Sequence, residues 1–317
     1  MAFARTTLVG TNCSSHPAIK LLSGCKGVSS IYTVVPKRAR DASPVAFIKQ
    51  RSHDHPQEDG IRQEYENLLT LQRLLQRTDL LDSVPQPLGF DRSLNCLAVT
   101  VLPGSAIQRG FYVGAIRGFG IGKLLNDARK LGAWLGKFQM ATQQALLTGL
   151  DEQSNQAWKE LEECPFLGDR VRAEFEMVLA TLSDNVAPVA SVFCHGDFSL
   201  RNILVSPQSD IAVIDWEHMR LSHPLADPVW LICNMLLATR YWARLKPILL
   251  IAKGFLSSWR SHTQELRMPN SVARGLFVAG VIDSMRRLER KNDVTRKKHV
   301  LQNISEAGLY LLHECEW

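Results

Sequence analysis

Three polar residues in the second half of the chain have the types and the spacing of a catalytic centre. Asp197 and Asn202 are separated by four residues, and Asp215 follows two apolar stretches, 203–205 and 211–214, that predict short strands. A carboxylate can take a proton or share a hard cation, and an amide oxygen can coordinate a cation without adding charge. Together, the three residues suit a reaction that needs a base beside a divalent cation.

The sequence around these residues resembles that of a known superfamily. His-Gly-Asp at 195–197 and Ile-Asp-Trp-Glu at 214–217 are similar to motifs of the aminoglycoside phosphotransferase and choline kinase superfamily, whose members are protein-kinase-like small-molecule phosphotransferases. Protein kinases themselves carry His-Arg-Asp and Asp-Phe-Gly at these places. The resemblance implies that Asp197 accepts the proton of a substrate hydroxyl, while Asn202 and Asp215 hold Mg²⁺ against the phosphates of ATP.

The match extends over six residues in the order of the family pattern, with two predicted strands between them, which makes a chance match of three letters a poor explanation. They are His195, Gly196, Asp197, Asn202, Asp215 and Glu217. The segment 198–202 also resembles a subgroup of small-molecule kinases associated with surface-polysaccharide genes, although those more often carry Pro-Trp at 200–201. The role of Glu217 stays open.

The start of the chain predicts a strand, a loop and a second strand. The strands are expected at 19–22 and 31–35, and the loop between them contains glycine and serine. Glycine lets backbone amides approach a phosphate without an intervening Cβ, although an ordinary hairpin would have the same composition. Gly24 and Gly27 are therefore candidates for backbone contacts with the phosphates of ATP. The resemblance implies that Ser29 and Ser30 lie under the same phosphates.

Lys49 ends an apolar strand expected at 44–49. It resembles the strand lysine that contacts the α- and β-phosphates in the kinase pattern. Such a lysine needs a carboxylate to hold it, and the helix predicted at 61–75 offers Glu64 and Glu66. At about 100° per residue, Glu64 lies within the apolar stripe of this helix and Glu66 points away. We expect Glu64 to pair with Lys49; the alternative is a surface glutamate near a helix start.

A last strand pair, expected at 86–90 and 94–101, leads into Leu102-Pro103-Gly104. This segment resembles the hinge of the family, where backbone N–H and C=O groups pair with adenine. Thr100 and Leu102 are named as contacts for that reason, by position only. Later in the chain, Asp227 resembles the family aspartate that opens a helix and braces the catalytic loop.

Beyond the hinge, apolar residues recur at helical spacing. We therefore expect an α+β, bilobal protein-kinase-like fold with two domains. Residues 1–104 would form a small N-terminal lobe, with an antiparallel sheet, the nucleotide-binding residues and the hinge. Residues 105–317 would form a larger, mostly helical lobe that carries the catalytic and substrate-binding residues.

The composition agrees with a globular enzyme of 317 residues, because 45% of them are hydrophobic and 21% are charged. Seven scattered cysteines without C-x-x-C spacing favour a reducing cytoplasm. The N-terminus lacks the apolar core of a signal peptide. The most hydrophobic run, 228–238, is followed by Arg240 and ends short of the about 20 residues that span a bilayer. We expect a cytoplasmic protein without a transmembrane segment.

The net charge is +6, and basic residues gather at 286–291 and 296–299. A solvated helix face is the plain interpretation, and attraction to an anionic partner is the alternative. No nucleic-acid-binding motif accompanies these residues, so a nucleic-acid partner is not expected.

The resemblance implies an ATP- and Mg²⁺-dependent phosphotransferase that acts on a hydroxyl of a small molecule, with a sugar, aminosugar or cyclitol as the favoured acceptor. A basic chain suits polycationic aminoglycosides poorly, and an aromatic cage for choline cannot be located from the tryptophans alone. A catalytically silent pseudokinase that serves as a binding module is a further alternative, opposed by the presence of Lys49 and all the catalytic carboxylates. A protein kinase is disfavoured by the missing Ala-Pro-Glu motif.

Overall fold

In the computed structural model, the protein forms two compact units. The first unit contains the described residues up to Gly104 together with Ala212–Met219, and the second contains the other described residues. The structure describes residues 18–24, 29–35, 45–51, 59–117, 120–144, 146–147, 151–165, 167–183, 189–237, 245–266, 268–290, 298–315 and 317.

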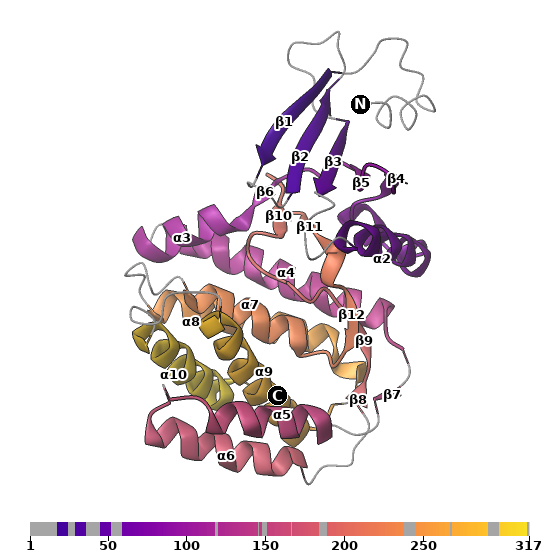
Figure 1. Ribbon diagram of the computed structural model, residues 1–317. Helices are drawn as coiled ribbons and strands as arrows, with labels where there is room; N and C mark the ends of the chain where they lie inside the picture. The colour runs from indigo at the N-terminus through magenta and orange to yellow at the C-terminus, as the bar shows by residue number, and fades with distance from the viewer. Residues whose placement is uncertain are drawn as a thin grey trace. The chain divides into compact units, whose positions relative to one another are not determined.

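The first unit is built on an antiparallel sheet of five strands in the order β1-β2-β3-β5-β4. The strands are β1 (Ala18–Gly24), β2 (Ser29–Val35), β3 (Ala46–Arg51), β4 (Pro87–Asp91) and β5 (Cys96–Thr100). Figure 1 shows β1, β2 and β3 side by side. Alternation along β3 places Ala46 and Ile48 in a core with Val34, Cys96 and Ala98. Lys49 consequently points to the opposite face of the sheet.

Helix α2 (Gly60–Leu75) packs against β3, β4 and β5. Its apolar residues recur every three or four positions, so they form one stripe, in which Ile61, Leu68 and Leu71 have no exposed surface. Glu64 lies on this buried face, as its place in the sequence predicts. The unit also contains η1 (Leu81–Ser83), η2 (Trp216–His218) and most of β11 (Ile211–Val213).

The second unit is mostly helical. Its helices are α3 (Ile107–Arg117), α4 (Ile121–Ala141), α5 (Asp151–Glu162), α6 (Asp169–Ser183), α7 (Ala226–Leu236), α8 (Leu245–His262), η4 (Gln264–Leu266), α9 (Asn270–Arg290) and α10 (Lys298–Glu314). Short antiparallel strand pairs lie among them. They are β6 (Ser105–Ala106) with β10 (Ile203–Val205), β7 (Leu146–Leu147) with β8 (Val189–Ala190), and β9 (Val192–Cys194) with β12 (Arg220–Ser222). The loop that contains Asp197 runs from β9 to β10.

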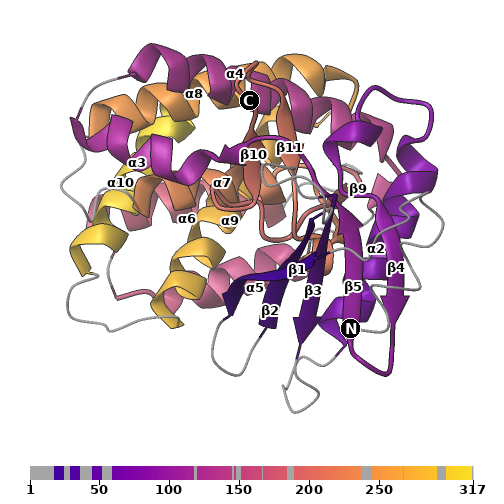
Figure 2. The same ribbon diagram turned by 90° about the horizontal axis from the view of Figure 1, so that it is seen from above.

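Helices α4 and α8 lie against each other in the second unit (Figure 2). Gly132 makes this approach possible, because a Cβ at this position would collide with the carbonyl oxygen of Phe255. Gln139, fully buried near the end of α4, accepts a hydrogen bond from Trp259 Nε1 at 2.8 Å and donates one to the carbonyl oxygen of Pro224 at 2.7 Å. One amide therefore joins α4, α8 and the loop before α7.

The elements confirm the α+β class, with a small antiparallel sheet in the N-terminal part of the chain and helices in the C-terminal part. Among the described residues, no helix combines the length and the apolar character that crossing a membrane requires.

The basic stretch late in the chain is partly described. Arg286 pairs with Glu163 at 2.7 Å and with Glu289 at 2.5 Å, and Arg287 pairs with Asp283 at 2.8 Å. Residues 291–297 lie outside the described part. Because Arg286 and Arg287 neutralise carboxylates of the same unit, they give no support to an anionic partner at this surface.

Candidate active site

The polar residues predicted from the sequence fall into two groups, one in each unit. In the first unit, Lys49 stands at the centre of three carboxylates. Its Nζ lies 2.8 Å from Glu64, 2.6 Å from Asp215 and 3.3 Å from Glu217. The Lys49 side chain is only 18% exposed, so these contacts are worth more than a surface ion pair.

The charges of this group act on one another. Burial alone would lower the pKa of Lys49, but Glu64, Asp215 and Glu217 raise it above its ordinary value. Burial raises the pKa of the Glu64 carboxyl, and the Lys49 ammonium counteracts that rise. The lysine is therefore a fixed positive charge, and Glu64 holds it, as the place of Glu64 in the apolar stripe of α2 predicts.

Arg51, two residues after Lys49, is buried and donates to Glu217 Oε2 from Nη2 at 2.9 Å. A Cβ at Gly60 would collide with the Arg51 guanidinium, so the first residue of α2 leaves room for this side chain. Arg51 and Lys49 thus share Glu217, which fixes the position of a carboxylate whose role the sequence left open.

The same carboxylates fit a hard cation. One oxygen each of Glu64, Asp215 and Glu217 lies within 4.8 Å of the others, and carboxylate oxygens are the ligands that Mg²⁺ takes in proteins. The Asp215 side chain is the most exposed of the three, at 33%. The donor set of the first unit is therefore suited to the metal that the sequence motif implies.

Asp215 has a left-handed backbone conformation, with φ of 71° and ψ of 60°. The turn around it is held from two directions. Trp216, which is fully buried, donates from Nε1 to the carbonyl oxygen of Val213 at 2.9 Å, and Asn67 of α2 donates to the carbonyl oxygen of Trp216 at 2.7 Å. The surrounding structure keeps Asp215 in a conformation that non-glycine residues rarely adopt.

In the second unit, the carboxylate of Asp197 is buried and accepts hydrogen bonds at both oxygens. Trp230 of α7 donates from Nε1 to Oδ1 at 3.0 Å. At Oδ2, Arg201 donates at 2.5 Å and Asn202 at 3.3 Å. The Asn202 amide also donates to the carbonyl oxygen of Asp197 at 2.9 Å, so the loop closes on itself and fixes the direction of the carboxylate.

Asp227 braces this loop from α7. Its Oδ2 accepts from the His195 amide at 2.6 Å and its Oδ1 accepts from the Gly196 amide at 3.0 Å. Burial raises the pKa of Asp227, and His195 together with the two amide donors works against that rise. Asp227 lies in the first turn of α7, one residue after its start, and the residue before the helix is Leu225. The φ of 80° at Gly196 is a conformation that glycine adopts without strain.

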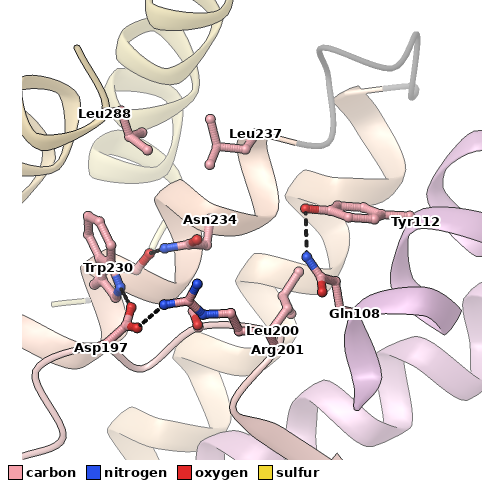
Figure 3. A pocket seen from close by; sticks show the side chains of 10 residues that line it. Gln108, Tyr112, Asp197, Leu200, Arg201, Trp230, Asn234, Leu237 and Leu288 are labelled. Carbon is pink, nitrogen blue, oxygen red and sulfur yellow. Dashed lines mark hydrogen bonds and ion pairs between the residues drawn. The ribbon is translucent and has the colours of Figure 1, made fainter. Parts of the chain in front are cut away.

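The Asp197 carboxylate lines a cavity of about 190 Å³ in the second unit. This is far more space than the roughly 10–15 Å³ that one water needs, so the cavity can admit an organic molecule. Figure 3 shows the Trp230 indole and the Arg201 guanidinium both directed at Asp197. The lining residues are Gln108, Tyr112, Asp197, Ser199, Leu200, Arg201, Trp230, Asn234, Leu237 and Leu288.

The remaining predicted residues belong to the first unit. Gly24 pairs with Ser30 where β1 and β2 meet, and Ser29 lies opposite Arg51 of β3. Gly27 lies outside the described residues. The amide of Thr100 donates to the carbonyl oxygen of Gln86 at 2.9 Å, so this N–H is already engaged in the unit. Leu102 follows the end of β5 and is partly buried.

The profile of the phosphotransferase enzyme family matches residues 38–264, which is more than half of the chain. This chain belongs to the phosphotransferase enzyme family. Membership confirms the superfamily and the kinase class that the motifs around Asp197 and Asp215 indicate. No curated protein sequence matches the chain significantly.

Three solved structures have a fold similar to that of this phosphotransferase. Glucosamine kinase has 14% identity and a TM-score of 0.59, covering 98% of this chain and 82% of that one. A thermostable mutant of an aminoglycoside phosphotransferase, in ternary complex with ADP and hygromycin B, has 14% identity and a TM-score of 0.55, with coverage of 97% and 99%. Amicoumacin kinase, in complex with AMP-PNP and Ca²⁺, has 13% identity and a TM-score of 0.52, with coverage of 98% and 95%.

Several residues that form hydrogen bonds to the predicted site residues of this phosphotransferase were not predicted from the sequence to have that role. Arg51 and Trp230 are examples, because their contacts with Glu217 and Asp197 join segments 166 and 33 residues apart. Arg201 offered a local signal, since it follows Asp197 by four residues and stands where the resembling subgroup more often has tryptophan. A cation so close to the expected base is a feature of this chain that the motif does not explain.

Proposed function

We propose that this phosphotransferase moves the γ-phosphate of ATP, with Mg²⁺, to a hydroxyl of a small molecule, and that a sugar, aminosugar or cyclitol is the favoured acceptor. The supporting observation is the position of Asp197. Its buried carboxylate lines a cavity of the second unit and is fixed by hydrogen bonds at both oxygens. A carboxylate held in a fixed direction beside space for a ligand suits a base that must orient a hydroxyl.

In this proposal, residues 1–104 form the nucleotide-binding lobe with its hinge, and residues 105–317 form the catalytic and substrate-binding lobe. Lys49, fixed by Glu64, binds the α- and β-phosphates. The β1–β2 loop approaches the phosphates through Gly24, Gly27, Ser29 and Ser30. Adenine pairs with backbone groups of Thr100 and Leu102, and at Thr100 the carbonyl oxygen is the group considered, because the amide already donates to Gln86.

Asp215 and Asn202 would hold the metal through a carboxylate and an amide oxygen. When bound, Mg²⁺ would neutralise charge on the phosphate oxygens. Lys49 would keep Asp215 oriented before the nucleotide arrives, since its Nζ is 2.6 Å from that carboxylate.

Transfer would be direct. The O–H bond of the acceptor breaks and its proton passes to the Asp197 carboxylate. The acceptor oxygen forms a bond to the γ-phosphorus as the bond between that phosphorus and the bridging β–γ oxygen breaks, and ADP leaves. No covalent intermediate on the enzyme is needed, because positioning and charge neutralisation suffice for phosphoryl transfer.

Replacing the proposed base tests this function. Asp197→Asn keeps the shape of the side chain but removes the carboxylate, so we expect kcat to fall by about 10² to 10⁴ while ATP affinity is retained. Turnover is measured with acceptors found in a screen of sugars, aminosugars, cyclitols, choline and aminoglycosides, and ATP affinity is measured by calorimetry. Asp169→Asn, at the exposed start of α6, is the matched control. Unchanged turnover would show that Asp197 is not the base, and lost ATP affinity would make it a nucleotide ligand instead.

Removal of the metal is the second test. We expect a chelator to abolish phosphate transfer, and added Mg²⁺ or Mn²⁺ to restore it, because Asp215 and Asn202 offer the oxygen ligands that these ions prefer. Product formation is followed by mass spectrometry, with folding checked by circular dichroism. Full activity in metal-free buffer would contradict the proposal.

A further inference from the structure

The cavity beside Asp197 has an unusual charge balance for a site that would bind a cation. Of the ten lining residues in the described part of the chain, only Asp197 and Arg201 are charged, and they pair with each other at 2.5 Å. The other polar lining residues are Gln108, Tyr112, Ser199 and Asn234, which are neutral. A polycationic acceptor would find one carboxylate here, and that carboxylate already accepts hydrogen bonds at both oxygens.

The aromatic residues of the cavity do not form a cage for a quaternary ammonium either. Such a cage needs open ring faces, and Cζ of Arg287 already lies 5.4 Å from the centroid of the Trp230 ring. Trp230 also donates its N–H to Asp197, which fixes the ring edge. Among the described lining residues, Tyr112 is the other aromatic one, and it accepts a long hydrogen bond, 3.5 Å, from Gln108.

Arg201 is the residue of the cavity that is best suited to binding an anionic ligand. Its side chain is 60% exposed, whereas that of Asp197 is 12% exposed. A guanidinium presents a planar fork of donors that matches a carboxylate or a phosphate, and it remains charged at any relevant pH. The exposed guanidinium can therefore reach an anion that enters the cavity, and Asp197 would still accept hydrogen bonds from Trp230 and Asn202.

A second donor lies in the same wall. Ser199 is 4% exposed, and its Oγ is buried without a hydrogen-bond partner in the described structure. Buried hydroxyls normally have a partner. This Oγ has almost no exposed surface, so it would meet a polar atom of a ligand when the side chain turns toward the cavity that Ser199 lines. Ser199 and Arg201 belong to the same loop, two residues apart.

We propose that the acceptor carries an anionic group, a phosphate or a carboxylate, in addition to the hydroxyl that is phosphorylated, and that Arg201 binds this group. The inference rests on the proposed function and names the class of its acceptor. Binding of the anion draws the Arg201 guanidinium from Oδ2 of Asp197, and that oxygen can then accept the hydroxyl proton. Neutral or cationic acceptors would leave the pair closed and would react slowly.

The test compares acceptors that share a sugar or cyclitol ring and differ in the charge of one substituent. The probes are glucose, glucuronate, glucose 6-phosphate and glucosamine, together with inositol and inositol 1-phosphate. We expect kcat/KM for the preferred anionic member to exceed that of its neutral counterpart by about ten- to hundredfold, the usual size of a hydrogen bond to a charged group. Comparison of glucuronate with glucose 6-phosphate separates carboxylate from phosphate recognition. Acceptor binding in the presence of a non-hydrolysable ATP analogue is measured by calorimetry.

Arg201→Gln should remove most of that preference, lowering kcat/KM for the anionic acceptor by at least tenfold more than for the neutral one. Arg170→Gln, an exposed arginine of α6, is the matched control and should preserve the ratio. Three results would overturn the inference: neutral or cationic probes used as well as anionic ones, no binding of any anionic probe, or an equal loss with every acceptor in Arg201→Gln. The last result would place Arg201 on the transferred phosphate. If the probes bind but none is phosphorylated, the proposed function itself fails.

Discussion

Lys49 and Asp197 show two ways in which a buried or largely buried charge is kept in place. Lys49 is one cation among three carboxylates, so any one of them can change its partner while the lysine stays neutralised. Asp197 is one carboxylate among three donors, from Trp230, Arg201 and Asn202. In each case the residue proposed to act on the substrates has more partners than a single ion pair requires, and that surplus lets a ligand replace one of them.

The surplus at Lys49 leads to a prediction. Lys49→Ala removes the proposed contact with the α- and β-phosphates, so we expect kcat/KM for ATP to fall by about ten- to hundredfold or more. It also removes the cation that Glu64 and Asp215 share, while Glu217 keeps Arg51, so the protein should become less stable as well. Kinetics with varied ATP and thermal unfolding measure the two effects. Lys159→Ala, on an exposed position of α5, should change neither. Unchanged kinetics in Lys49→Ala would move the phosphate contact to another residue.

The pairing of Lys49 with Glu64 was predictable because it depends on local rules. Lys49 follows an apolar strand, and Glu64 lies within the apolar stripe of α2 by its spacing from Ile61 and Leu68. The contact between Asp197 and Trp230 was not predictable in this way, because it depends on how the loop and α7 pack. Arg51 meets Glu217 across 166 residues for the same reason.

At the scale of elements, the periodicity of apolar residues and the composition predict which segments form strands and helices. They predict the first and last residues of these elements less accurately. The strand expected at 44–49 begins two residues later and ends at Arg51, and α2 begins at Gly60. Asp227 was expected to open α7 but lies within its first turn, since its carboxylate is needed by the amides of His195 and Gly196. A tertiary contact therefore decided the exact place of a residue whose type was predicted correctly.

The contact between α4 and α8 gives a prediction at this scale. Gly132→Ala places a Cβ against the backbone of Phe255 and Trp259, which cannot move as a flexible side chain would. We expect a loss of about 1–3 kcal/mol in the free energy of unfolding. Gly122→Ala, in the same helix with no atom within 4 Å of the added Cβ, should instead gain about 0.5–1 kcal/mol. Urea unfolding measures both, and equal effects of the two substitutions would contradict the packing argument.

For the whole molecule, one buried histidine ties stability to pH. Burial and, to a lesser degree, Arg220 lower the pKa of His223 from 6.5 to about 4. Between these two values the folded protein keeps His223 neutral while the unfolded chain takes up a proton. The unfolded state therefore binds more protons, and stability falls as the pH falls below 6.5 toward 4.

We expect His223 to account for a loss of about 2 kcal/mol in the free energy of unfolding between pH 7 and pH 5. Urea unfolding at both pH values measures the change. In His223→Asn the loss should be smaller by about that amount, whereas His299→Asn, at an exposed position, should behave like the wild type. The same pH dependence in His223→Asn and the wild type would show that other groups are responsible.

The left-handed backbone of Asp215 suggests how functional residues can be identified before the acceptor is known. Holding a non-glycine residue with φ of 71° costs on the order of 1 kcal/mol, and its carboxylate lies among other carboxylates. Both Asp215→Gly and Asp215→Ala lose the ion pair with Lys49 and should lose phosphate transfer, but only the glycine relieves the backbone conformation, so Asp215→Gly should unfold less easily than Asp215→Ala. Asp215→Ala, which keeps a Cβ in the strained conformation, is the matched comparison. A set of substitutions ranked by resistance to urea would then identify the residues that this enzyme retains for activity at the expense of stability.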